Sequence, residues 1–184
     1  MAIVPDAKNW TWVLDEQCPE CGFRAGLVDV TEIGSLVRAN VACWPPLLAV
    51  TTARRRPADD RWSALEYACH VRDVFRLFDE RLRLMLETDA PQFANWDQDV
   101  AAIAERYDLQ DPVVVADELV AAGLTIAERW ETVRDDQRQR TGDRSDGSRF
   151  TVETFARYFL HDPVHHLHDV AVGNEMLTDQ AGPA

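Results

Sequence analysis

The chain has 184 residues and a formal net charge of −13, from 32 acidic and 19 basic residues. This length is typical of one domain with a sizeable core. The acidic excess repels phosphate backbones, so nucleic acid is not expected as a partner. No apolar run approaches the roughly 20 residues of a membrane-spanning helix, and the first residues do not resemble a signal peptide. We therefore expect a cytoplasmic protein that acts on a small molecule and binds no membrane.

The first segment, residues 1–30, has no sustained hydrophobic period and is expected to form an irregular arm. It contains the sequence Cys18-Pro-Glu-Cys21, which has the form of a zinc knuckle. A structural zinc site usually needs a second pair of ligands, and Cys43 and Cys69 lie singly in predicted helices. Three interpretations therefore stay open: a structural zinc site, a redox pair, or a tight turn of reduced thiols.

The first predicted helix begins at Thr31, and its apolar residues recur at steps of three and four. Pro45 and Pro46 each remove a backbone donor. We expect a kink at these prolines or a short second helix at 46–52.

The clearest predicted helix begins with the capping-box pattern Ser63-Ala-Leu-Glu66 and extends to about Glu87. Its apolar residues form a heptad seam, accompanied by a second apolar stripe. Such a helix is buried on two sides, as in a four-helix bundle. The seam consists of Ala64, Ala68, Val71, Phe75, Phe78, Leu82 and Met85.

Residues 88–111 form a long connection with a short helix expected at 98–106. Connections of this length tend to be functional or to cover another part of the domain. A third helix is expected at 112–138, and a polar loop that contains glycine follows at 141–148. Thr151 caps the fourth helix. We predict no strand.

These elements predict an all-α fold, a four-helix bundle with an irregular N-terminal arm. The expected divisions are the arm at 1–30, the bundle at 31–176 and a flexible tail at 177–184. Bundles of this type often form homodimers, although no stretch of the sequence identifies an interface.

Four of the five histidines lie within eight residues near the C-terminus. His161 and His165 are four positions apart, so on a helix they lie one turn apart on the same face and can bind one metal ion. The fifth histidine, His70, lies near the start of the second long helix. We predict a three-histidine site between facing helices, open to water or substrate at a further position. His166 and His168 point away from the pair and are not predicted ligands.

Zinc fits three neutral imidazoles best, and nickel and iron are alternatives. Glu66, one turn before His70, is a candidate fourth ligand or general base, although its capping role competes. Asp73 and Asp162 are candidates for orienting the ligands. Tyr158 shares a helix face with the histidine pair and is a further catalytic candidate.

Pro163 lies between the two histidines of the fourth helix. It cannot donate to the carbonyl group of Phe159, so we expect a kink there. Alternatively, Asp162 caps a new helix with Pro163 at its first position.

The sequence resembles the DinB-like superfamily of four-helix bundles over about residues 31–172. In particular, it resembles actinobacterial members grouped with mycothiol-dependent maleylpyruvate isomerases and thiol transferases. The motifs that carry the resemblance are Trp62-Ser63-x-x-Glu66-x-x-x-His70-x-x-Asp73, Trp96-Asp97-Gln98-Asp99 with Arg106-Tyr107, and His161-Asp162-x-x-His165-His166. The resemblance implies a divalent metal on His70, His161 and His165. The chain departs from the family pattern at Pro163 and at Leu167-His168, where Gly-Gln is common.

The resemblance also implies an activity. Some family members use their metal to activate a low-molecular-weight thiol, such as mycothiol, for transfer or isomerisation, and we expect such an enzyme here. The alternatives are a hydrolase that uses metal-bound water and a non-catalytic metal-binding stress-response protein. Arg72 and Arg157 are candidates for holding a substrate carboxylate, although a surface role is the simpler interpretation.

Overall fold

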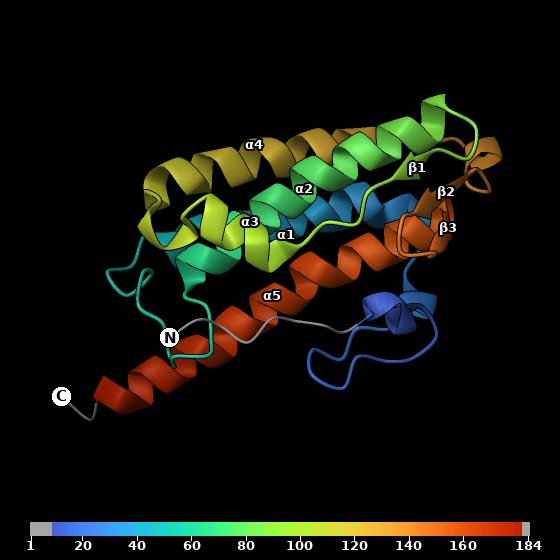
Figure 1. Ribbon diagram of the computed structural model, residues 1–184. Coiled ribbons are helices and arrows are strands. Elements are labelled where there is room, and N and C mark those ends of the chain that lie inside the picture. The colour runs from blue at the N-terminus through green and yellow to red at the C-terminus, as the bar shows by residue number, and fades with distance from the viewer. Residues whose placement is uncertain (1–8, 182–184) are drawn as a thin grey trace.

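The computed structural model describes residues 9–181 of the chain. Within this range the long helices form a bundle, with an irregular arm packed against the last of them (Figure 1). The long helices are α1 (Ile33–Leu48), α2 (Ala64–Glu87), α4 (Pro112–Glu131) and α5 (Val152–Ala181). The predicted all-α bundle with an irregular N-terminal arm is confirmed. No helix in the described range is long and apolar enough to cross a membrane.

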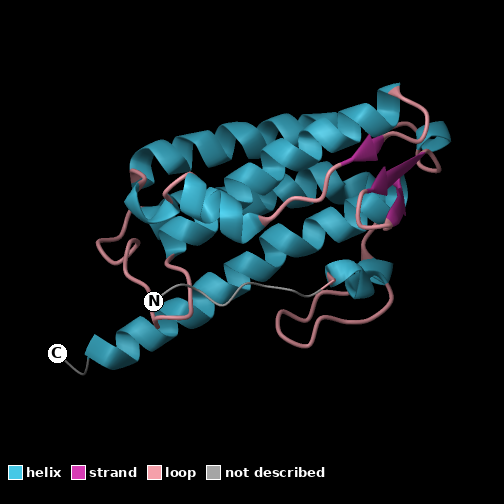
Figure 2. Cartoon of the chain, viewed as in Figure 1, coloured by secondary structure: helices cyan, strands magenta, loops and turns pink. Residues whose placement is uncertain are grey.

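Short elements precede and connect these helices (Figure 2). They are the helix α3 (Gln98–Ala104) and the 3-10 helices η1 (Trp10–Leu14), η2 (Ala25–Leu27), η3 (Val30–Glu32), η4 (Tyr107–Leu109) and η5 (Asp135–Gln137). The predicted short helix at 98–106 corresponds to α3, whereas the third long helix ends earlier than expected, at Glu131.

The helix α2 begins as its sequence predicts. Its cap, Ser63, accepts a hydrogen bond from the backbone N–H of Glu66, and the Glu66 carboxylate accepts one from the Ser63 N–H at 2.9 Å. These bonds satisfy backbone donors that have no partner in the first turn of a helix. The heptad seam of α2 is buried along its whole length.

The prolines of α1 do not end it. The helix continues through Pro45 and Pro46 to Leu48, so of the two alternatives, a kink or a separate helix at 46–52, the separate helix is wrong. Each proline removes one hydrogen bond from the helix. Trp44 and Leu48 flank the prolines and are both buried in the core, and their packing offsets this loss.

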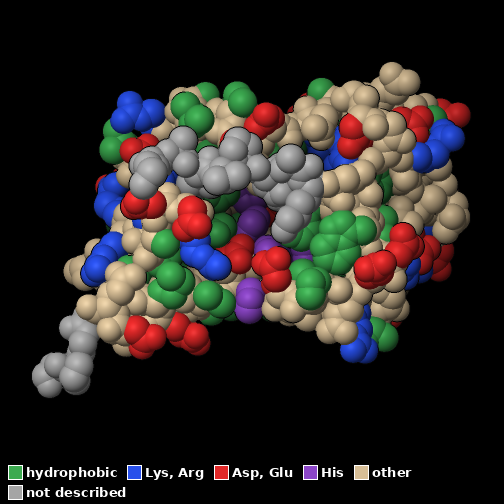
Figure 3. All heavy atoms as spheres, turned by 60° about the horizontal axis from the view of Figure 1, so that its bottom comes forward, with side chains coloured by type: hydrophobic (Ala, Val, Ile, Leu, Met, Phe, Trp, Pro, Cys, Tyr) green, Lys and Arg blue, Asp and Glu red, His purple; other side chains and the backbone are tan. Residues whose placement is uncertain are grey.

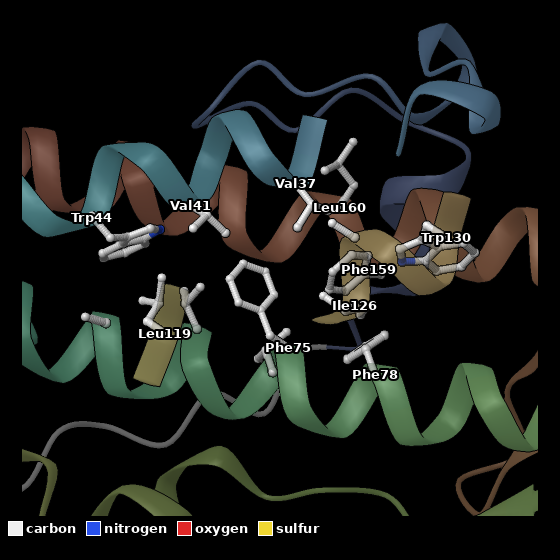
Figure 4. Packing of buried hydrophobic residues seen from close by; sticks show 14 of the residues in the cluster. Val37, Val41, Trp44, Phe75, Phe78, Leu119, Ile126, Trp130, Phe159 and Leu160 are labelled. Carbon is white, nitrogen blue, oxygen red and sulfur yellow. The ribbon is translucent and has the colours of Figure 1, made fainter. Parts of the chain in front are cut away.

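The core lies between the four long helices (Figure 4). Gly123 of α4 allows the closest approach within it. A Cβ atom at this position would lie 2.2 Å from Val41 Cγ2 and 2.9 Å from Phe75 Cε2. Because such distances are far below van der Waals contact, α4 packs more closely against α1 and α2 than an alanine would allow.

A small sheet forms at one end of the bundle, so the prediction of no strand is wrong. Its order is β1-β2-β3, with β1 (Gln92–Phe93) parallel to β2 (Thr141–Arg144) and β2 antiparallel to β3 (Arg149–Thr151). Strands of two to four residues are too short to show an alternating pattern in the sequence. The sheet joins the long connection after α2 to the hairpin before α5.

The helix α5 runs without interruption through Pro163. No new helix therefore begins at Asp162. The side chain of Asn40 donates to the Pro163 carbonyl at 2.8 Å, which ties this turn of α5 to α1. The helix also continues to Ala181, so residues 177–181 are helical where a flexible tail was expected. Residues 182–184 lie outside the described part.

Candidate functional site

A cavity of about 800 Å³ opens beside α5, between the N-terminal arm, the start of α2 and the connection that carries α3. Figure 3 shows histidine side chains within a hollow of this face, next to acidic and hydrophobic ones. The walls include the aromatic residues Trp10, Trp62, Tyr67, Phe78, Trp96 and Tyr158. The volume of this cavity, and its lining of both polar and hydrophobic side chains, are typical of a binding site for a small molecule.

Three side chains from α2 and α5 converge beside this cavity, and we call them the cavity cluster: His70, Asp162 and His166. Each offers a ligand atom that lies within 4.8 Å of the other two. His70 Nε2 lies 3.3 Å from Asp162 Oδ1, and His166 Nε2 lies 3.7 Å from the same oxygen. Two imidazoles and a carboxylate are a ligand set for a divalent transition metal.

Three atoms of the cavity cluster are buried without a hydrogen-bond partner in the described structure: His70 Nδ1, His70 Nε2 and Asp162 Oδ1. Two of them, His70 Nε2 and Asp162 Oδ1, face each other without forming a well-directed bond. A buried polar atom that lacks a partner is costly. A cation between these atoms would satisfy both, so the residues present fit a metal ion.

The surroundings of the cluster fix its side chains. The ring of His70 stacks on Trp96, with centroids 5.4 Å apart, and touches Trp62 on another side. The Nδ1 atom of His166 lies 2.9 Å from a carboxylate oxygen of Asp169. A carboxylate on one ring nitrogen directs the other nitrogen toward a metal, an arrangement common among histidine ligands.

The carboxyl group of Asp162 is held in its ionised form. Burial alone would raise its pKa, but the charges of His70 and His166 outweigh this effect and lower the pKa to about 2. The group is therefore a carboxylate at neutral pH, the form that can bind a metal. Asp162 was expected to orient the ligands, and the structure places it among the candidate ligand atoms themselves.

His161 and His165 lie together, with ring centroids 5.1 Å apart, but they face the N-terminal arm. There they meet Cys18 and Cys21, and we call these four residues the cysteine cluster. Burial, followed by the charge of His165, lowers the pKa of His161 to about 4. Burial also lowers the pKa of His165. Both rings are therefore neutral at pH 7, the form that binds metal.

The predicted triad of His70, His161 and His165 is thus divided between two clusters. Successive residues of a helix point about 100° apart. The pair at 161 and 165 and the pair at 162 and 166 have the same spacing but face different neighbours. Spacing alone could not distinguish them, so the approach of His166 to His70 was not predicted.

Glu66 and Asp73 have structural partners. The Glu66 carboxylate is bound by Ser63 and by the guanidinium group of Arg56. Asp73 accepts hydrogen bonds from Arg72 at 2.8 Å and from the Tyr107 hydroxyl at 2.5 Å. Neither carboxylate belongs to a ligand cluster in the described residues.

Tyr158 lines the cavity, one helical turn before Asp162. Its hydroxyl oxygen accepts a hydrogen bond from Arg144 at 2.9 Å. Burial raises the pKa of Tyr158, although Arg144 opposes the effect. The phenol therefore keeps its proton at neutral pH and can donate it toward the cavity.

Two buried arginines line the cavity, and sequence reasoning identified neither. Arg81 and Arg144 are 5% and 8% exposed. Arg144 forms an ion pair with Asp146, whereas Arg81 makes no carboxylate ion pair with any described residue and donates to the carbonyl group of Ala94 at 2.6 Å. Burial, followed by the charge of Arg144, lowers the pKa of Arg81 to about 10. Two buried cations beside a cavity favour an anionic ligand.

The two arginines proposed from the sequence have other partners. Arg72 donates to Asp73, to Gln110 at 2.7 Å and to Glu118 at 2.9 Å. Arg157 forms an ion pair with Glu153. Neither is among the cavity-lining residues.

Comparison with known proteins agrees with this fold. A solved structure of YfiT from Bacillus subtilis, described as "a probable metal-dependent hydrolase with an unusual four-helix bundle topology", superposes with a TM-score of 0.62 and 16% sequence identity. The match covers 95% of this chain and 94% of that one. A search of curated proteins returns no match. The family model of the DinB superfamily matches residues 47–170, about two thirds of the chain. This chain therefore belongs to the DinB superfamily.

Proposed function

We propose that this protein is a metal-dependent enzyme whose divalent metal is bound by the cavity cluster of His70, Asp162 and His166. The observation that carries the proposal is the convergence of these three ligand atoms, two of which have no hydrogen-bond partner in the described structure. Zinc, nickel and iron all accept two imidazoles and a carboxylate. When bound, such a metal supplies a Lewis acid that lowers the pKa of a thiol or of water.

The protein side chains around the metal have separate tasks. Asp162 contributes negative charge, and Asp169 fixes the ring of His166 through its Nδ1 atom. Tyr158 retains its proton and can donate it to an oxygen atom of a substrate. Arg144 holds the Tyr158 oxygen from the other side, so the phenol proton remains available for the substrate.

We propose a small substrate with a carboxylate or another anionic group. Arg81 and Arg144 would bind this group, because both are buried cations at the cavity wall. The aromatic walls would cover the apolar part of the substrate. The leading activity is the transfer or isomerisation of such a substrate with a low-molecular-weight thiol, as in the thiol-using members that the sequence resembles.

A metal-dependent hydrolase is the second candidate. It is favoured by YfiT, which is described as a probable metal-dependent hydrolase and has the same fold at 16% identity. The two activities differ in the nucleophile: a hydrolase uses water where a transferase uses a thiol.

Metal analysis tests the premise that both activities share. The purified protein is stripped with a chelator, reloaded with zinc, nickel or iron, and analysed for metal per chain. We expect His70→Ala and His166→Ala each to lose about one equivalent. His168→Ala is the matched control, because His168 lies on the same helix outside both clusters. Equal metal content in all three variants would refute the ligand assignment.

An activity assay then distinguishes the candidates. The metal-loaded protein is given an electrophile that carries a carboxylate, with and without a low-molecular-weight thiol, and separately given activated esters and amides. Thiol-dependent conjugation or isomerisation that is lost in His166→Ala supports the transferase. Hydrolysis without thiol that is lost in the same variant supports the hydrolase. Inactivity in every assay would leave a non-catalytic metal-binding protein.

A further inference from the structure

We propose a second metal site, a structural zinc site that joins the N-terminal arm to α5. Its four ligands are the members of the cysteine cluster, Cys18, Cys21, His161 and His165. This proposal does not depend on the proposed enzymatic function, because the cavity cluster shares none of these residues.

The four ligand atoms already lie close together. Each is within 4.8 Å of every other one, and Cys18 Sγ lies 3.6 Å from His165 Nδ1. A tetrahedral zinc ion, with bonds of about 2.3 Å to sulfur and 2.0 Å to nitrogen, separates its ligand atoms by roughly 3.3–3.8 Å. The cluster therefore needs only small side-chain movements to enclose the ion.

The arm presents its two thiols through a tight turn. The N–H group of Gly22 donates to the Cys18 carbonyl at 3.0 Å, and the N–H of Cys18 donates to the Phe23 carbonyl at 2.9 Å. Gly22 has φ of +76°, a conformation that few other residues adopt. Neither cysteine forms a disulfide bond.

The helix α5 supplies the second pair. His161 and His165 lie one turn apart, so their rings can reach one ion. Cys-x2-Cys and His-x3-His are spacings found in zinc sites with two cysteines and two histidines. The sequence lacks a second cysteine pair. In place of that pair the fold provides His161 and His165, which begin 140 residues after Cys21.

Three of the four residues of the cysteine cluster are buried, and Cys21 is half-buried. Cys18, His161 and His165 are 1%, 4% and 6% exposed. The ring of Trp10 lies 5.5 Å from that of His161 and 5.3 Å from that of His165, and Phe23 covers His161 from another side. Four protein ligands with little access to water are typical of structural zinc, whereas catalytic zinc keeps an open position.

A reason for such a link lies in the weak packing of the arm. In its first described part, before α1, only Val13, Cys18 and Ala25 are buried among hydrophobic residues. Leu14, Phe23, Val28 and Val30 pack against the core but are only partly buried, so the hydrophobic anchoring of the arm is limited. The arm nevertheless contributes Trp10 and Glu20 to the cavity wall. A zinc ion would therefore fix one wall of the cavity.

The test measures zinc in the full-length protein and in single-cysteine variants. Cys18→Ser and Cys21→Ser should each contain about one equivalent of metal less than the native protein. Cys43→Ser is the matched control, because Cys43 is an exposed thiol of α1 outside the cluster and should keep the native content. Equal content in all three variants overturns the proposal.

Cobalt substitution identifies the ligands directly. Tetrahedral cobalt with two thiolate ligands gives intense visible bands and a sulfur-to-metal charge-transfer band. We expect these bands in the native protein and in His70→Ala, and not in Cys18→Ser. If His70→Ala keeps the cobalt bands but loses activity, the cysteine cluster is a separate site from the cavity cluster. Loss of the bands in His70→Ala, or their survival in Cys18→Ser, overturns the proposal.

A measurement on the native chain avoids variants that fail to fold. A thiol reagent is added to the zinc-loaded protein, and the released zinc is followed with a colorimetric chelator while mass spectrometry locates the modified cysteines. We expect about one zinc to be released in step with modification of Cys18 and Cys21. Modification of both cysteines without zinc release, or a disulfide between them in the purified protein, overturns the proposal.

Discussion

Replacing Arg81 with methionine should stabilise the fold and weaken anion binding in the same variant. Arg81 is a buried cation that makes no carboxylate ion pair with any described residue. Its guanidinium group lies over the ring of Phe93, 4.9 Å from the centroid, and near Phe78. Methionine keeps the apolar contact with these rings and removes the buried charge.

The size of the effect follows from the pKa of Arg81. Burial, followed by the charge of Arg144, lowers this pKa from 12.5 to about 10. At about 1.36 kcal/mol per pKa unit, the charged form costs the native state roughly 3 kcal/mol. The cost is fully present at neutral pH, because the group is charged at every pH well below 10. Loss of the charged hydrogen bond to Ala94 and of the cation–π attraction to the two rings offsets roughly 2 kcal/mol. We therefore expect Arg81→Met to raise the free energy of unfolding by about 1 kcal/mol.

Urea unfolding, followed by tryptophan fluorescence near neutral pH, measures both parts of the prediction. The matched control is Arg83→Met, because Arg83 lies on the same helix with an exposed side chain. Phosphate and succinate, added at constant ionic strength, should stabilise the native protein and Arg83→Met through binding to the native state. Neither anion should stabilise Arg81→Met. A loss of more than about 2 kcal/mol in Arg81→Met, or an equal response of all three proteins to the anions, would refute the reasoning.

Three further variants test the core, the ion pairs and the catalytic assignment. Gly123→Ala should lower the free energy of unfolding by about 1–3 kcal/mol, because its Cβ would lie 2.2 Å from Val41 Cγ2. A variant that is more stable than the native protein in urea would contradict this close packing of α4. Asp146→Asn should cost about 1–2 kcal/mol at neutral pH and clearly less near pH 2.5, since Arg144, as the largest cause, lowers the pKa of Asp146 to about 2. The stabilisation declines as the pH falls below about 4 and is lost as it passes through about 2. An equal cost at both pH values would contradict this assignment. Tyr158→Phe should lower kcat by roughly 10- to 100-fold without changing metal content, and an unchanged kcat would exclude its phenol as a proton donor.

The helices were predictable because the forces that define them are local. In α2 the capping box, the heptad seam and the last turn all depend on residues within one helix. The strands were not predictable, since β1 pairs with β2 across about 50 residues and neither is long enough to show a period. The end of α5 was also missed, because its final turns carry a mixed sequence without an apolar period.

Part of the site was predictable for a related reason. The pairing of a histidine from the second long helix with ligands on the last helix follows from how bundles place residues on facing helices. His70 does meet candidate ligands of α5, but these are Asp162 and His166 rather than the predicted His161 and His165. The choice of face depends on how α5 is rotated about its axis, and this rotation is set by packing against three other helices.

The same rotation explains why α5 can carry two ligand pairs. The face turned toward α2 presents positions 162 and 166, and the adjacent face presents 161 and 165 to the arm. One turn of helix therefore contributes to both clusters, and a shift of α5 about its axis would displace the ligands of both at once. The Asn40 side chain, bound to the Pro163 carbonyl between the two pairs, opposes such a shift. Pro163 has no backbone N–H, so this turn of α5 lacks one helical hydrogen bond. The hydrogen bond from Asn40 of α1 therefore supplies a restraint that the helix itself does not provide here.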